Sequence, residues 1–228
     1  MKNYLMLASL AAVAIPSAAM AETGSDWTLE GGVSAASDYR FRGISLSDQD
    51  PQVSGELSVS HKSGFYASVW ASNVALTGSA SDVEADWIVG WNGKLGKANL
   101  QVNGTYYSYP GNSGFNYYEV NTALGTNLGK SEIKIGLAYA PKQDNLGGRD
   151  NTYVYVSGNA PIGDTPLSIS GTFGIEDGAF ADAKKDWQLG LSYDLGGGFE
   201  ASASYVDTAH ANTPLGKATA LASLKRGF

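Results

Sequence analysis

Most of the chain consists of short runs in which apolar and polar residues alternate, separated by turns rich in glycine, asparagine, serine and proline. The run 83–95 is the most regular, with Trp87, Val89 and Trp91 at odd positions and Glu84 and Asp86 at even ones. Successive side chains of a β-strand point to opposite faces, so each run predicts a strand with one apolar and one polar face. We predict about twelve strands, with ten or fourteen as alternatives: 27–41, 53–61, 65–74, 83–95, 98–109, 116–128, 132–139, 151–160, 167–175, 187–195, 199–206 and 217–228.

The predicted connections alternate in length along the chain. Those after the even-numbered strands are tight turns, such as 96–97 and 129–130, whereas those after the odd-numbered strands are longer and more polar, such as 141–150. An up-and-down transmembrane barrel has short turns at one end and longer loops at the other. A Greek-key sandwich would not order its connections so regularly. The pattern therefore predicts an all-β chain, folded as a transmembrane up-and-down antiparallel β-barrel.

The composition agrees with strands and excludes several classes of protein. Charged residues make up 16% of the chain, aromatic residues 11%, and there are 29 glycines, which suits neither a helical nor a disordered protein. The formal net charge of −7 and the absence of a basic patch argue against a nucleic-acid partner. The chain has no cysteine, so disulfides and thiolate metal sites are excluded, and we expect neither a cofactor nor a metal.

Residues 1–21 have the three parts of a secretory signal peptide. Lys2 supplies the positive charge, residues 5–15 are apolar, and Ala19 and Ala21 fit the small-residue cleavage pattern. The apolar segment is too short to cross a bilayer as a helix. Because no linker-like stretch divides the remainder, we expect an exported protein with a cleaved signal peptide, 1–21, and one outer-membrane barrel domain, 22–228.

The apolar face of the predicted sheet is far larger than one domain of this length could bury, so we expect it to face lipid. The other face carries mainly serine, asparagine, glutamine and threonine, which suits a water-filled lumen. Twelve steps separate Trp27 from Tyr39, a height of about 30 Å at roughly 3.3 Å per residue and a tilt of about 40°. Aromatic residues at strand ends therefore predict a girdle at the membrane interface: Trp27, Tyr39, Phe41, Trp87, Trp91, Trp187 and Phe228.

The densest charge in the alternating pattern lies in Ser37–Ser45, where Asp38, Arg40 and Arg42 share the predicted lumen face. One interpretation is a charged constriction that selects solutes, as rings of charged side chains do in pores. The other is an ion-paired anchor, in which Asp38 and a lumen carboxylate such as Glu56 or Glu84 neutralise the arginines and tie down the first loop. The candidate lumen residues are Asp38, Arg40, Arg42, Glu56, Glu84, Asp86 and Glu119.

Two segments, SDYRFRGIS at 37–45 and GFYASVWASNV at 64–74, resemble the TorF-type porin family of proteobacterial outer-membrane proteins. The likeness covers the chain after residue 21 in length and strand rhythm and is strongest in its first third. The resemblance implies an outer-membrane barrel with a pore and brings no catalytic residues.

No catalytic constellation is predicted, so we expect a protein that is not an enzyme. The only histidines, His61 and His210, belong to connections at opposite ends of the predicted barrel, so they cannot share a metal or build a Ser-His-Asp triad. The acidic segment 176–186 lacks the spacing of a calcium-binding EF-hand loop, and we expect it to be a solvated loop.

The function expected from these observations is passive diffusion of small hydrophilic solutes through an outer-membrane porin-like channel. The expected partners are outer-membrane lipid and lipopolysaccharide, the small solutes themselves, and the barrel-assembly machinery, which would recognise the C-terminal Phe228. The alternative is a structural or adhesion barrel in a Gram-negative outer membrane, with a plugged lumen that does not conduct.

Overall fold

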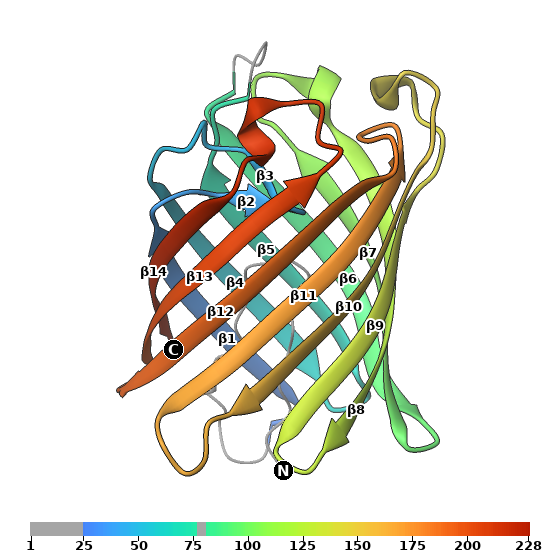
Figure 1. Ribbon diagram of the computed structural model, residues 1–228. Coiled ribbons are helices and arrows are strands. Elements are labelled where there is room, and N and C mark those ends of the chain that lie inside the picture. The colour runs from blue at the N-terminus through green and yellow to red at the C-terminus, as the bar shows by residue number, and fades with distance from the viewer. Residues whose placement is uncertain (1–24, 77–80) are drawn as a thin grey trace.

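The computed structural model describes residues 25–76 and 81–228 and shows a closed barrel of twelve tilted strands (Figure 1). Each strand pairs antiparallel with its neighbours along the chain, and β14 pairs with β1 to close the sheet. The predicted all-β antiparallel barrel and its strand number are confirmed. The strands of the barrel are β1 Trp27–Ala36, β4 Gln52–His61, β5 Phe65–Asn73, β6 Val83–Leu95, β7 Ala98–Ser108, β8 Tyr117–Leu128, β9 Ser131–Ala140, β10 Asn151–Pro161, β11 Leu167–Gly178, β12 Lys184–Gly196, β13 Phe199–Ala209 and β14 Thr219–Gly227.

Five smaller elements lie in the described parts of the connections. Two short strands, β2 Arg40–Phe41 and β3 Ile44–Ser45, pair with each other and not with the barrel. Three 3-10 turns, η1 Ser113–Phe115, η2 Asp144–Leu146 and η3 Pro214–Gly216, lie in three of the long connections. Within the described residues, no helix is long and apolar enough to cross a membrane. The predicted signal peptide, 1–21, lies outside the described residues.

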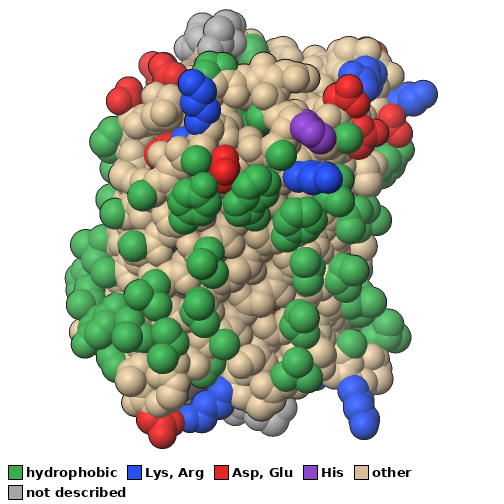
Figure 2. Space-filling model, viewed as in Figure 1, with side chains coloured by type: hydrophobic (Ala, Val, Ile, Leu, Met, Phe, Trp, Pro, Cys, Tyr) green, Lys and Arg blue, Asp and Glu red, His purple; other side chains and the backbone are tan. Residues whose placement is uncertain are grey.

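The two faces of the wall differ in the way that the alternation predicts. Side chains such as Val89 and Leu128 point outward and are about two-thirds exposed, whereas Glu84 and Glu119 point inward and are almost fully buried. Hydrophobic side chains spread over the outer wall, and charged ones gather towards its two ends (Figure 2). The barrel therefore has an apolar outside and a largely polar lumen.

Two strands that the pattern left irregular are resolved by the packing inside the barrel. Ile88, the apolar exception on the polar face of β6, points inward and is buried. In β10, where Tyr153 and Tyr155 alternate with valines, the tyrosines face the lumen and the valines face outward. The hydroxyl of Tyr153 donates a hydrogen bond to Asp186 at 3.0 Å. An inward tyrosine can satisfy its hydroxyl, which an outward one in an apolar band could not.

Long and short connections lie at opposite ends of the barrel, as predicted (Figure 1). Several strand limits differ from the sequence-based expectation, and three of them matter for the site. The first strand ends at Ala36 and not at Phe41, because the chain leaves the wall there and turns into the barrel. The ninth barrel strand, β11, continues to Gly178, and the tenth, β12, already begins at Lys184, so most of the acidic segment 176–186 belongs to the wall.

Candidate functional site

The connection between β1 and β4 folds into the lumen as a small hairpin, which we call the lumen hairpin, residues 38–47. Phe41 pairs with Ile44, and the two residues between them make the turn. Arg42 has φ of 49° and Gly43 has φ of 83°, so both lie in the left-handed region that a two-residue hairpin turn of type I′ requires. Glycine adopts this conformation freely, whereas arginine does so at a cost. That cost is offset by the contacts that the Arg42 side chain makes.

Asp38 organises the base of the lumen hairpin. Its carboxylate accepts hydrogen bonds from Ser45 Oγ at 2.6 Å and Ser47 Oγ at 3.0 Å, and it pairs with Arg40 Nε at 2.6 Å. All four side chains are buried. A carboxylate with several donors and a charged partner is satisfied without water, so the hairpin is internally rigid.

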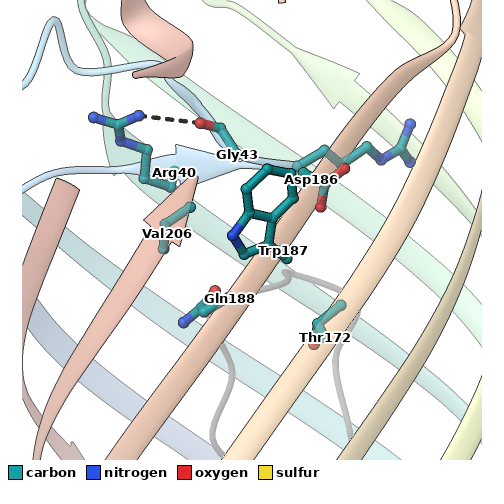
Figure 3. Close-up of a pocket in the computed structure, with 8 residues that line it drawn as sticks. Arg40, Gly43, Thr172, Asp186, Trp187, Gln188 and Val206 are labelled. Carbon is teal, nitrogen blue, oxygen red and sulfur yellow. Dashed lines mark hydrogen bonds between the residues drawn. The ribbon is translucent and has the colours of Figure 1, made fainter. Parts of the chain in front are cut away.

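Arg40 ties the lumen hairpin to the last long connection. Its Nη1 atom donates to the carbonyl oxygen of Leu215, in η3, at 2.7 Å and to that of Lys217 at 3.2 Å. It also donates to the carbonyl of Gly43 at 3.1 Å, which holds the turn closed (Figure 3). The guanidinium therefore joins two connections that are about 175 residues apart in the chain.

Arg42, at the tip of the lumen hairpin, crosses to the opposite wall. Its Nη2 atom lies 2.7 Å from both carboxylate oxygens of Glu119 in β8, and its Nη1 atom lies 2.9 Å from Glu176 Oε1 in β11. Lys184 in β12 completes the cluster, with Nζ 2.8 Å from Glu176 and 3.8 Å from Asp186, and it donates to the carbonyl of Arg42. Burial alone would lower the pKa of Arg42, but the carboxylates of Glu119 and Glu176 hold it well above its ordinary value.

Aromatic rings pack around this charge cluster. The Arg42 guanidinium lies 4.6 Å from the ring centroid of Phe41 and 4.5 Å from that of Tyr153, within cation–π distance of both. Tyr39 packs against Trp70 of β5 at 5.3 Å between centroids, and Phe41 packs against Tyr107 of β7 at 5.9 Å. The lumen hairpin is thus held by apolar contacts on one side and by ion pairs on the other.

The prediction that Tyr39 and Phe41 belong to the membrane girdle is wrong. Tyr39 is only 3% exposed and belongs to the buried aromatic cluster inside the barrel, and Phe41 is packed against that cluster. The reason is that the alternating pattern continues past Ala36, where the wall ends. Alternating aromatic and charged residues are found in a strand of the wall, but they equally give a hairpin inside the lumen one aromatic side and one charged side.

The other predicted girdle residues lie on the outer surface. Trp27 and Trp87 are 56% exposed, Trp91 and Trp187 are partly exposed, and Phe228 is 49% exposed at the end of the chain. Their contact with a membrane interface stays a prediction.

The remaining predicted lumen residues differ in their partners. Glu84 and Asp86 face inward beside the lumen hairpin, and Glu84 accepts a hydrogen bond from Tyr109 at 2.9 Å. Glu56 lies away from it and pairs with Lys225 at 3.0 Å. The anchor hypothesis offered Asp38 together with Glu56 or Glu84 as partners of the arginines. Asp38 does pair with Arg40, but neither Glu56 nor Glu84 pairs with an arginine. The partners of Arg42 are Glu119 and a residue that the prediction did not include, Glu176.

Three residues of this cluster, Glu176, Lys184 and Asp186, were expected in a solvated loop. Their burial follows from a signal present in the sequence, because Phe173 and Ile175 continue the apolar face of β11 and so place Glu176 on the polar one. Lys184 and Asp186 continue the inward face of β12 in the same way. Residues 176–186 are predicted as a loop because they are rich in charge, although the alternation of apolar and polar residues in the two flanking strands continues into them.

A small cavity lies beside the lumen hairpin, against the wall formed by β11, β12 and β13 (Figure 3). Its inward-facing wall residues are mainly polar, with Thr172 from β11, Gln188 from β12 and Val206 from β13. The remaining lining residues are Arg40, Arg42, Gly43, Asp186 and Trp187. The cavity therefore lies between the two arginines of the lumen hairpin and a mainly polar part of the wall, next to the ion-pair cluster.

Several solved structures have a similar fold. The KdgM porin gives a TM-score of 0.59 at 9% identity, over 87% of this chain and 98% of that one. The NanC porin gives 0.54 at 13% identity, over 87% and 97%. An outer membrane channel from Pseudomonas putida F1 gives 0.55 at 10% identity, over 88% and 95%. At these identities the likeness establishes the fold, which is that of outer-membrane porins.

No curated protein matches the chain in sequence. A family model does match it, over residues 20–228, and therefore over the whole of the barrel. The chain belongs to the family described as "Bacterial protein of unknown function (Gcw_chp)".

Proposed function

We propose that this protein is an outer-membrane channel through which small hydrophilic solutes diffuse passively, and that the lumen hairpin is its constriction. The observation that carries the proposal is the Arg42 side chain, which spans a polar lumen to Glu119 and Glu176. A narrow charged section inside a polar barrel is the arrangement by which pores select solutes. The porin fold of the similar structures and the resemblance to the TorF-type porins support the same function.

We further propose that the barrel lies in a bacterial outer membrane. The apolar outer wall suits the hydrocarbon of an outer membrane, and the exposed tryptophans suit its interfaces. Lipopolysaccharide and lipid would contact this wall, and the assembly machinery would recognise Phe228. We propose no catalytic role and no nucleic-acid partner.

The test is single-channel recording of the refolded chain, residues 22–228, in a planar bilayer. We expect discrete conductance steps. No steps above background, with a barrel that keeps its heat-resistant mobility on gels, would sink the channel proposal. Arg40→Ala and Arg42→Ala should then change the ratio of cation to anion permeability, because each removes a positive charge from the constriction.

A second candidate, a plugged structural or adhesion barrel, is favoured by one observation. The lumen hairpin is held at both ends of its charged side, by Arg40 to η3 and by Arg42 to β8 and β11. Unchanged selectivity combined with loss of heat-resistant mobility in the arginine variants would favour this role. Deletion of residues 38–47 also distinguishes the channel from the structural barrel. If the protein is a channel, removal of the lumen hairpin should increase its conductance. If it is a structural barrel whose lumen is blocked elsewhere too, the deletion variant should still not conduct.

A further inference from the structure

The buried charges of the barrel do not balance. Among the described residues, the buried ionisable acids and bases are six carboxylates and three basic side chains, all towards the end with the long connections: Asp38, Glu84, Asp86, Glu119, Glu176 and Asp186 against Arg40, Arg42 and Lys184. The three bases are all engaged, Arg40 with Asp38 and the other two with Glu119, Glu176 and Asp186. Glu84 and Asp86 are left with no basic partner among the described residues.

These two carboxylates also have oxygens without hydrogen-bond partners. Glu84 is 1% exposed and Asp86 is 7% exposed, and within the described part of the chain neither Glu84 Oε2 nor Asp86 Oδ1 has a partner. They occupy alternate positions of β6 and so point to the same side of the wall. Tyr109 donates to the other oxygen of Glu84, but a buried carboxylate with no cation beside it remains costly, so the pair is suited to a positively charged ligand.

The neighbouring strands continue the line of unsatisfied oxygens. Ser68 in β5 lies diagonally across from Asp86 and pairs directly with Ser58 in β4. Both serine hydroxyls are buried and lack partners among the described residues. Four of the six such atoms in the described barrel therefore follow one another across β4, β5 and β6. One shared proton could satisfy the carboxylates only, whereas a hydrated cation would neutralise the carboxylates and supply water to the hydroxyls.

We propose that Glu84 and Asp86 bind a hard divalent cation of the calcium type, with its remaining coordination positions taken by water and by oxygens of the adjoining wall. Ca²⁺ prefers carboxylate, hydroxyl, carbonyl and water oxygens and tolerates irregular geometry. No group of three or more His, Cys, Asp or Glu side chains suited to a metal occurs in the described residues, so the protein supplies two charged ligands and no more. A charge of +2 matches these two carboxylates.

Tyr39 closes the site from the side of the lumen hairpin. Burial raises the pKa of its hydroxyl well above the ordinary value, and the charges of Glu84 and Asp86 raise it further, so the phenol stays neutral beside them. Tyr109 donates to Glu84 Oε1 at 2.9 Å and leaves Oε2 available. The cation would therefore lie between the wall and the hairpin, which makes it a second tie on the hairpin besides Arg42.

Terbium is the probe for the test, because it binds calcium sites and its emission is sensitised by nearby aromatic rings. Trp70 is the direct cross-strand neighbour of Asp86. We expect the full barrel in detergent micelles to show tryptophan-sensitised Tb³⁺ emission, displaced by Ca²⁺ at lower concentrations than by Mg²⁺, which demands a more regular shell. In Glu84→Gln/Asp86→Asn the apparent affinity should fall by about tenfold or more.

Two matched controls make the outcome decisive. Glu56→Gln/Glu200→Gln removes two other lumen-facing carboxylates and should leave the emission unchanged, as should Asp177→Asn/Asp182→Asn on the exposed loop. Loss of emission in either control but not in the Glu84/Asp86 variant would overturn the proposal, as would an absence of sensitised emission. If the Glu84→Gln/Asp86→Asn variant fails to fold, the unaltered barrel provides the test. Its unfolding temperature should be higher in the presence of Ca²⁺ than in the presence of EDTA, and equal temperatures would also overturn the proposal. This readout needs no conductance, so it stands apart from the channel proposal.

Discussion

The Nη2 atom of Arg42 lies 2.7 Å from both carboxylate oxygens of Glu119, across the lumen and 77 residues apart in the chain. Both side chains are at least 97% buried. Because this pair joins an inward hairpin to the far wall, it sets where the hairpin stands in the barrel.

Removal of Arg42 should destabilise the barrel much more than removal of a surface base. Arg42→Ala leaves Glu119 buried with no ion-pair partner among the described residues, which costs about 3–5 kcal/mol of unfolding free energy. Lys130→Ala removes an exposed pair with Asp164 and should cost less than about 1 kcal/mol. Urea unfolding of the refolded barrels, followed by tryptophan fluorescence, measures both. Equal losses of unfolding free energy in the two variants would show that the Arg42–Glu119 pair stabilises the barrel no more than an exposed ion pair does.

A methyl group at Gly43 should push the lumen hairpin away from the wall. A Cβ there would lie 2.3 Å from Thr208 Cγ2 and 2.9 Å from Asp186 Cβ, at a φ of 83°. Gly96 is the matched control, because its φ is 61° and a Cβ would meet nothing within 4 Å. Both alanine variants incur the left-handed backbone cost of about 1–2 kcal/mol. Only Gly43→Ala should displace the hairpin.

The displacement can be measured by thiol labelling, since the chain has no cysteine of its own. Leu46→Cys places one thiol on the hairpin, packed against the buried aromatic cluster. Maleimide should label it faster when it is combined with Gly43→Ala than when it is alone or combined with Gly96→Ala. The same rate in all three proteins would contradict the predicted clash.

Deletion of Phe228 should impair closure of the barrel. The seam between β1 and β14 has five register pairs, and the backbone of Phe228 extends it with two hydrogen bonds of 2.9 Å to Gly31. We expect a smaller fraction of heat-resistant barrel on gels after refolding. Phe65→Ala is the control, because it removes an aromatic ring that is 62% exposed and lies outside the seam between β1 and β14. The fraction of heat-resistant barrel in this variant should stay near that of the unaltered chain. Equal yields from the two variants would argue against a role in closure.

Tryptophan quenching tests which face meets lipid. Variants that keep only Trp87, 56% exposed, or only Trp70, 8% exposed, are compared in vesicles whose acyl chains carry bromine. Trp87 should lose much of its fluorescence and Trp70 should keep its own, because bromine quenches only rings close to it. Matching vesicles without bromine provide the reference intensities. Stronger quenching of Trp70 would reverse the orientation of the wall.

Local pattern was enough to predict the barrel. Alternation along a run such as Val83–Leu95 depends only on neighbouring residues, and it determines which side chains face outward, because a strand has a period of two. The alternating lengths of the connections add the up-and-down order. Both signals are local, and so they are readable from the chain without knowledge of its contacts.

The place of the lumen hairpin was decided by the tertiary structure. Residues 37–45 alternate as well as any wall strand, so the pattern cannot show that the wall ends at Ala36 and that Tyr39 turns inward. That turn depends on partners far away in the chain, Glu119 and Glu176 for Arg42 and the η3 carbonyls for Arg40. The amino-acid sequence by itself determined the closed barrel and its two faces, whereas only long-range charge pairing inside the closed barrel decided what fills its lumen.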